Sequence, residues 1–202
     1  FIIEYISTLE KAAMEDFYND FMLFIREVSN NHQAYDSIST SVLKMTAIFS
    51  EKIDGTKFGE QKRVRRDISD VFHKYLPNAL DSDIESNVDA VKIFQDLEFV
   101  SSKLRYIISE VLFSDKFSNC VSIIVTHAIT PYFKFKAEKD IPDYVLRLAL
   151  SVAKSGNKVK NWKLLIGETF HDDKKFALIV KNRIWRDIIF EWSQYPENKE
   201  RL

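Results

Sequence analysis

Glu168 and His171 stand three residues apart in the stretch ETFHDD, so on a helix both side chains would share one face. Glu-x-x-His is half of the pattern that holds a carboxylate-bridged pair of iron ions, and the complete site needs a second half and two further glutamates. The nearest second half is Asp70-x-x-His73, which has the wrong acid. We therefore expect no metal site, and we interpret ETFHDD as a helix end, where a partly cationic histidine suits the negative end of the helix dipole.

Other residues that could catalyse a reaction lack an activating context. Cys120, the one cysteine, lies in the apolar stretch FSNCVSIIV with no basic neighbour, and no GxSxG motif is present. Only four glycines occur, and neither GxGxxG nor GxxxxGK[ST] is among their patterns. His127 lies in an apolar helix and is predicted to be a hydrogen-bonded core residue. We expect no catalytic residues and no cofactor, and hence no enzyme.

The most concentrated charge is the basic run Lys62, Arg63, Arg65 and Arg66. On a helix Lys62, Arg63 and Arg66 would share a face that could bind the phosphates of anionic lipid or of RNA. The alternative is a solvated helix face with local ion pairs to the acidic neighbours Glu60, Asp67 and Asp70. Any polyanion must find such a local patch, because 29 Lys and Arg residues balance 30 Asp and Glu residues over the chain.

Apolar residues recur at three- and four-residue spacing along most of the chain, which predicts helices and no convincing strand. We expect Pro77 to stop the third helix, Pro131 to stop the fifth and Pro142 to begin the sixth. Trp162 and Trp185 are predicted to lie in the core. The expected helices cover approximately residues 2–28, 38–53, 61–76, 91–111, 117–129, 142–155, 159–170 and 182–192.

Eight helices that recur as pairs every 40 to 50 residues predict an all-α fold of antiparallel helical hairpins, stacked as a HEAT/armadillo-like α-solenoid segment. A compact helical bundle is the alternative. We treat residues 1–202 as a single helical repeat-like domain. The chain opens at Phe1 inside a helical pattern and stops at Leu202 in another, so we expect it to be a fragment of a much larger protein. Its apolar runs are too short to span a bilayer.

The last 115 residues or so resemble a known family in the order and spacing of their features. An apolar helix leads to Pro131-Tyr132-Phe133, and Trp162-Lys163 is followed by Asp172, Phe176 and the second tryptophan, Trp185. This pattern is similar to the C-terminal region of the Dopey family. QKRVRRDISDVF, which carries the basic run, is a vaguer match that precedes it.

The resemblance implies a large cytosolic helical scaffold that binds peripherally to Golgi and endosomal membranes. It also implies two partners, a large Sec7-related helical protein and a phospholipid flippase, and a role in endosome-to-Golgi trafficking. No catalytic residues come with the family. The alternative is a helical-repeat assembly factor of nucleolar pre-ribosomal particles, in which Lys62, Arg63 and Arg66 would contact ribosomal RNA.

Overall fold

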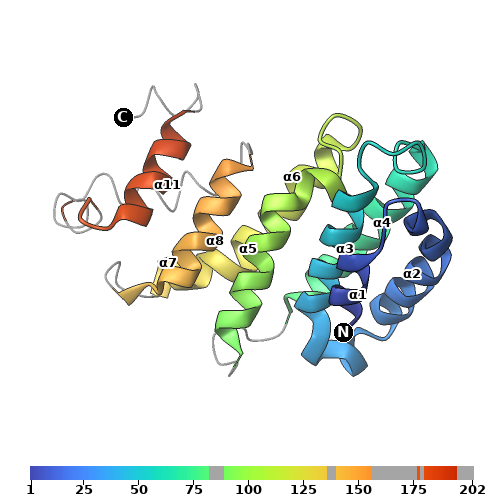
Figure 1. The fold of residues 1–202 in the computed structure, drawn as a ribbon. Coiled ribbons are helices and arrows are strands. Elements are labelled where there is room, and N and C mark those ends of the chain that lie inside the picture. Colours follow the sequence, from blue (N-terminus) through green and yellow to red (C-terminus); the bar gives the residue numbers. More distant parts are fainter. Residues whose placement is uncertain (82–88, 136–139, 156–176, 178–179, 195–202) are drawn as a thin grey trace.

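The computed structural model describes residues 1–81, 89–135, 140–155, 177 and 180–194. Throughout these ranges the regular elements are helices and no strand occurs, which confirms the predicted all-α class (Figure 1). The elements are α1 (Ile2–Thr8), α2 (Ala13–Asn30), η1 (His32–Ile38), α3 (Ser39–Ile53), α4 (Lys62–Ala79), α5 (Ala90–Ile107), α6 (Ser114–Ile124), η2 (Val125–Ile129), α7 (Thr130–Phe135), α8 (Asp143–Lys154) and α11 (Arg183–Ser193).

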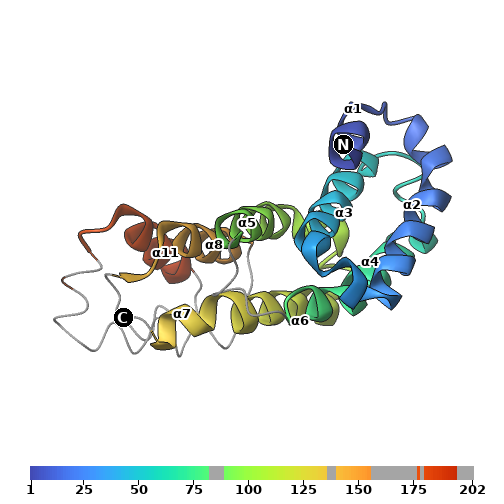
Figure 2. The ribbon, with the colours of Figure 1, turned by 90° about the horizontal axis from the view of Figure 1, so that it is seen from below.

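The helices lie in two rows. Figure 2 shows α3, α5, α8 and α11 side by side in one row, and α4, α6 and α7 in the other. At the N-terminal end α1 packs against α3 and α2 packs against α4, so each of these helices extends one row. Successive helices therefore alternate between the rows from α1 to α6, α7 continues the row of α6, and α8 and α11 lie in the row of α5.

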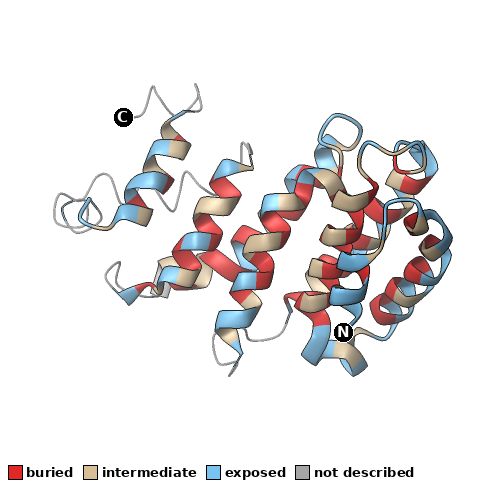
Figure 3. Cartoon of the chain, viewed as in Figure 1, coloured by how far each residue is buried: buried red, intermediate tan, exposed pale blue. Residues whose placement is uncertain are grey.

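The core lies between the rows and between neighbouring helices, as the buried faces in Figure 3 show. Helix α5 lies between α3 and α8 and buries Phe94, Leu97, Val100, Leu104 and Ile107, each at three- or four-residue spacing. Full burial of one such side chain contributes roughly 1.5–3 kcal/mol.

The predicted helix over 91–111 extends too far. The backbone at Ile108 is extended, with φ −125° and ψ 111°, so α5 ends one residue earlier. Val111 was expected to point inward but is 94% exposed in the connection to α6, and Val91 in the first turn of α5 is half exposed. Both residues are apolar at helical spacing, which the local pattern alone cannot distinguish from core positions.

The expected single helix over 2–28 is two helices in the structure, α1 and α2. At Leu9 the backbone is extended, with φ −59° and ψ 139°. The hydroxyls of Ser7 and Thr8 donate to carbonyls one turn earlier, and Lys52 Nζ on α3 donates to the carbonyls of Ser7 and Leu9 at 2.5 and 2.6 Å. Lys52 thereby satisfies the Ser7 carbonyl, one of those that a helix end leaves open. The break allows α1 to pack on α3 while α2 packs on α4.

Two prolines do not stop helices as expected. Pro77 lies in the last turn of α4, which continues to Ala79, and the amide of Leu80 donates to the Pro77 carbonyl at 3.1 Å. Pro131 is the second residue of α7 and does not end the helical segment. The widened π-helical turn η2 precedes it, so α6 passes into α7 without a loop.

Other boundaries match the prediction. Pro142 directly precedes α8, and Asn182 begins α11 because its side chain accepts hydrogen bonds from the amides of Ile184 and Trp185. Trp185 is buried, as predicted, and Trp192 is buried as well. The expected helix over 159–170, with Trp162, lies outside the described residues.

A buried carboxylate joins α3 to α5. Asp96 on α5 is 3% exposed, and its Oδ1 accepts a hydrogen bond from Lys44 Nζ at 2.8 Å. The hydroxyls of Thr40 and Ser41 donate to Oδ2 at 3.4 and 3.5 Å. All three donors come from one face of α3, so this contact sets how the two helices lie along each other.

We expect Lys44→Met to lower the free energy of unfolding by about 2–4 kcal/mol, because it leaves the Asp96 carboxylate buried with only two long hydrogen bonds. The matched control is Lys116→Met, which breaks an ion pair with the half-exposed Asp70 and should cost about 0–1 kcal/mol. Urea unfolding monitored by circular dichroism measures both losses. Equal losses would contradict a structural role for the buried pair.

Candidate functional site

The loop between α3 and α4 places the basic run at the start of α4. Gly55 has φ +72°, a conformation that L side chains rarely adopt. At Gly59 a Cβ atom would lie 2.0 Å from the Ile53 carbonyl oxygen, so only glycine fits. Thr56 holds the turn together: its hydroxyl donates to the Ile53 carbonyl at 2.6 Å and accepts from the Gly59 amide at 2.9 Å.

One of the four basic residues has a structural role. Arg65 is only 16% exposed, and its Nη2 donates to Glu60 at 2.5 Å and to Asp54 at 3.0 Å, which ties the loop to α4. Burial lowers the pKa of the Arg65 guanidinium, but the hydrogen bonds and charges of Glu60 and Asp54 outweigh it and hold this pKa above its usual value. The hydrogen bond from Arg65 in turn lowers the pKa of Glu60.

Lys62, Arg63 and Arg66 are all exposed on α4 and form what we call the α4 basic face. Arg63 Nε lies 3.7 Å from Asp67 Oδ2, an exposed and therefore weak pair. Lys62 and Arg66 form no ion pair with any described residue. The predicted face is thus present as a surface with three cations and one nearby carboxylate, which could attract a polyanion.

Most acidic neighbours of the basic run bind residues outside the α4 basic face. Asp67 Oδ2 also accepts a hydrogen bond from the Tyr18 hydroxyl of α2 at 3.3 Å. Burial first, and then the Asp67 charge, raise the pKa of Tyr18 to about 12. Glu60 pairs with Arg65, and Asp70 pairs with Lys116 on α6. Local ion pairing therefore occurs, but it neutralises Arg65 rather than the α4 basic face.

The two half-patterns for metal binding have different outcomes. Asp70 and His73 both contact α6, the first through Lys116 and the second through a 3.0 Å hydrogen bond between His73 Nε2 and the Asn119 side chain. They join α4 to α6. Glu168 and His171 lie outside the described residues. Within the described ranges no three or more His, Cys, Asp or Glu side chains gather as metal ligands would.

The prediction for His127 is wrong, because this side chain is exposed rather than buried. It lies in η2, where Val125, Ala128 and Ile129 face the core and Thr126 and His127 face outward. A π-helical turn adds a residue to the helical repeat and changes which positions face inward. The apolar neighbours of His127 in the sequence do not reveal this change.

Cys120 is fully buried in α6, beside residues that pack toward the core. Burial raises the pKa of the Cys120 thiol to about 12, although the charge of Lys116 has a smaller effect in the opposite direction. The thiolate is the reactive form of cysteine, so this residue behaves as a small core side chain.

The structure is that of an all-α protein whose described helices pack in two rows, and one helix, α4, carries a basic face. The chain belongs to the DOP1 C-terminal family, whose family model matches residues 1–202. This result confirms the resemblance to the Dopey family. The match extends over the whole chain, beyond the last 115 residues on which the resemblance rests.

Two fungal relatives agree with this assignment. The chain is 48% identical over 202 residues to Protein DOP1 of Saccharomyces cerevisiae. The aligned region is 100% of this chain and 12% of that protein. It is 22% identical over 221 residues to Protein dop1 of Emericella nidulans. This alignment covers 98% of this chain and 12% of that protein. The chain thus spans 12% of the length of each relative. No solved structure is significantly similar to it.

Among the helices that the structure describes, none is both long enough and apolar enough to cross a membrane.

We expect Cys120 to resist thiol reagents in the folded chain. With a pKa of about 12, roughly one thiol in ten thousand is ionised at pH 8, and the Sγ atom is also buried. Absorbance with Ellman's reagent should show almost no reaction in buffer and one thiol per chain in urea. The thiol has a higher pKa in the folded chain than in the unfolded chain. Its burial therefore lowers the free energy of unfolding only at a pH above the unfolded pKa, which is near 9. Rapid labelling of the folded chain at pH 8 would contradict this assignment.

Proposed function

We propose that this chain is a segment of a non-enzymatic scaffold that works in endosome-to-Golgi membrane trafficking. The observation that carries the proposal is the match of the DOP1 C-terminal family over residues 1–202. The helical architecture agrees with it, because an array of packed helices offers long exposed faces for protein partners.

We further infer that the two rows are part of a HEAT/armadillo-like α-solenoid rather than a compact bundle. In a solenoid each helical pair contacts only the pairs before and after it. Here α3 contacts both α1 and α5, α5 contacts α3 and α8, and α8 contacts α11. A bundle would instead bring helices from distant parts of the chain around one centre.

The proposed partners and location follow from the family resemblance. They are a large Sec7-related helical protein, a phospholipid flippase and the cytoplasmic surface of Golgi and endosomal membranes, to which the protein would bind peripherally. The absence of an enzymatic role is likewise proposed from the resemblance, which brings no catalytic residues. The names of the two fungal relatives describe no activity.

The α4 basic face is our candidate for contact with anionic lipid. Lys62, Arg63 and Arg66 are exposed, and each basic residue near an anionic surface contributes about 1 kcal/mol. The net charge of the chain is −1, so attraction to such a surface must come from a local patch. The family match does not favour the alternative, a nucleolar assembly factor, and we do not propose it.

Charge reversal tests the lipid contact. The variant Lys62→Glu, Arg63→Glu and Arg66→Glu should bind vesicles of phosphatidylserine and phosphatidylcholine about 100-fold more weakly in a flotation assay. The matched control reverses three exposed basic residues elsewhere, namely Lys11, Lys92 and Arg147, and should change binding much less. The difference should shrink as salt is added. Unchanged binding of the first variant would exclude the α4 basic face as the lipid contact.

Imaging of the tagged full-length protein tests the location. We expect fluorescence at Golgi and endosomal membranes, together with co-purification of a Sec7-related protein. The charge-reversed variant should lose part of the membrane signal, because it lacks the proposed lipid contact. A nucleolar signal would overturn the proposed function, whatever the vesicle result.

A further inference from the structure

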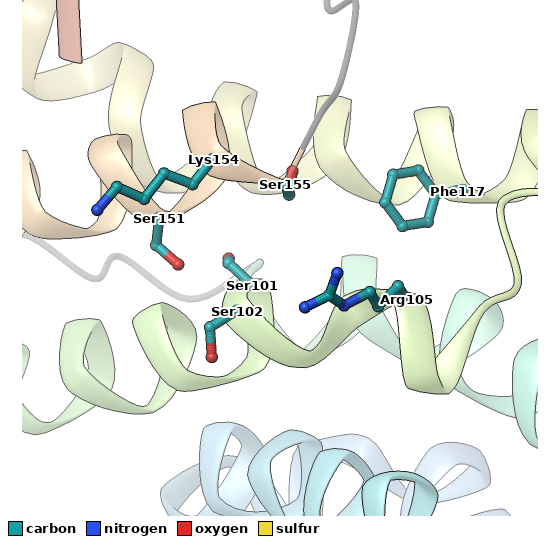
Figure 4. A pocket seen from close by; sticks show the side chains of 7 residues that line it. All are labelled: Ser101, Ser102, Arg105, Phe117, Ser151, Lys154 and Ser155. Carbon is teal, nitrogen blue, oxygen red and sulfur yellow. The ribbon is translucent and has the colours of Figure 1, made fainter. Parts of the chain in front are cut away.

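A pocket lies between α5, α6 and α8 (Figure 4). Its volume is about 190 Å³. A single water needs about 10–15 Å³ of such space, so the pocket has room for a group of several heavy atoms. The side chains that line it are Ser101, Ser102, Arg105, Phe117, Ser151, Lys154 and Ser155.

The lining is cationic and rich in hydroxyls. It holds two cations and four serines, and no acidic side chain is among the seven residues. Neither Arg105 nor Lys154 forms an ion pair with a described residue, and the Arg105 guanidinium lies 5.5 Å from the centre of the Tyr106 ring. Both cations stand in the last turn of their helix, where a cation is favourable in any case. That effect does not account for the serines.

The unpaired hydroxyl of Ser101 points to a ligand. Ser101 is 2% exposed, and its Oγ has no hydrogen-bond partner. Buried hydroxyls in folded proteins are nearly always paired, so an unpaired one needs an explanation. In Figure 4 the Ser101 hydroxyl and the Arg105 guanidinium both project into the space between α5 and α8.

The other three serines differ from Ser101. Their hydroxyls already donate to backbone carbonyls: Ser102 to Phe99 at 2.7 Å, Ser151 to Glu98 at 3.1 Å and Ser155 to Val152 at 2.7 Å. A serine hydroxyl that donates still has lone pairs to accept with. The Ser102 hydroxyl points away from α8 in Figure 4, so Ser151 and Ser155 are the two suited to a ligand that carries hydroxyl donors of its own.

We propose that this pocket binds the phosphate monoester of a small polyol. A monoester carries a charge of about −1.5 to −2 at neutral pH, which two cations balance. Arg105 offers two parallel N–H donors to the phosphate oxygens and Ser101 offers its unpaired hydroxyl, while Lys154 adds positive charge from the opposite end of the pocket (Figure 4). The polyol hydroxyls donate to Ser151 and Ser155. The pocket does not depend on the proposed trafficking function.

The same chemistry occurs in a soluble sugar or glycerol phosphate and in a lipid headgroup that ends in a monoester. Calorimetric titration of the 202-residue chain with sn-glycerol 3-phosphate tests the first source, with glycerol as the uncharged control. Flotation with vesicles that contain phosphatidic acid tests the second. Phosphatidylserine vesicles serve as the control here, because their headgroup is a phosphodiester. Both vesicle assays use the Lys62→Glu, Arg63→Glu and Arg66→Glu variant, so that the α4 basic face does not contribute to binding.

Three variants assign the binding to this pocket. Arg105→Gln should weaken binding at least about tenfold, since a charged hydrogen bond is lost. Ser101→Ala should weaken it about threefold or more and leave the midpoint of thermal unfolding unchanged or higher, because an unpaired buried hydroxyl is removed. Lys92→Gln removes an exposed charge from α5 outside the pocket and should change neither quantity.

The outcomes separate cleanly. Binding of glycerol 3-phosphate without binding of phosphatidic acid vesicles assigns a soluble ligand, and Arg105-dependent binding of those vesicles assigns a lipid. No binding of either probe at millimolar concentration would overturn the proposal. So would equal losses in Arg105→Gln and Lys92→Gln, or binding of phosphatidylserine as tight as that of phosphatidic acid by the variant with the α4 basic face reversed. A Ser101→Ala chain that binds like the original would remove Ser101 from the site.

Discussion

The packing of α5 between α3 and α8 is the constraint on which the rest of the structure depends. Helix α5 buries apolar residues toward both neighbours, and the same interface buries the Asp96 carboxylate. A buried charge is tolerated only with a partner. The apolar faces of α3 and α5 can therefore pack only in an arrangement that also brings Lys44 to Asp96. Hydrophobic burial thus supplies the stability of this interface, and the ion pair restricts how α3 and α5 can slide along each other.

Charges on this molecule separate into those that join helices and those that remain available. Arg65, Asp70 and Lys44 each bind a residue of another segment and hold the loop or the rows in place. The α4 basic face and the pocket cation Arg105 form no ion pair of comparable strength among the described residues. A scaffold needs both groups, because partner surfaces must be exposed on a framework that does not deform when they are occupied.

The spacing of apolar residues predicted where the helices lie but not where they begin and end. The stripe over Phe94, Leu97 and Leu104 is core because a helix at this spacing has one continuous apolar face. The break at Leu9 was not predicted, since apolar spacing continues through it and the donor that closes α1 is Lys52 from another helix. His127 was misplaced for a similar reason: the π-helical turn alters the facing of residues without altering their order.

The sequence by itself determined the all-α class, most helix centres, the family and the α4 basic face, because these depend on residues within a few turns of each other. Only the tertiary structure decided which charges are occupied. Arg65 and Arg66 are neighbours in the chain, yet one is paired and the other is exposed. It also decided the pocket, since Ser101 and Ser151 stand 50 residues apart in the sequence and meet only because α5 packs on α8. Contacts between distant residues depend on helix packing, which local patterns do not encode.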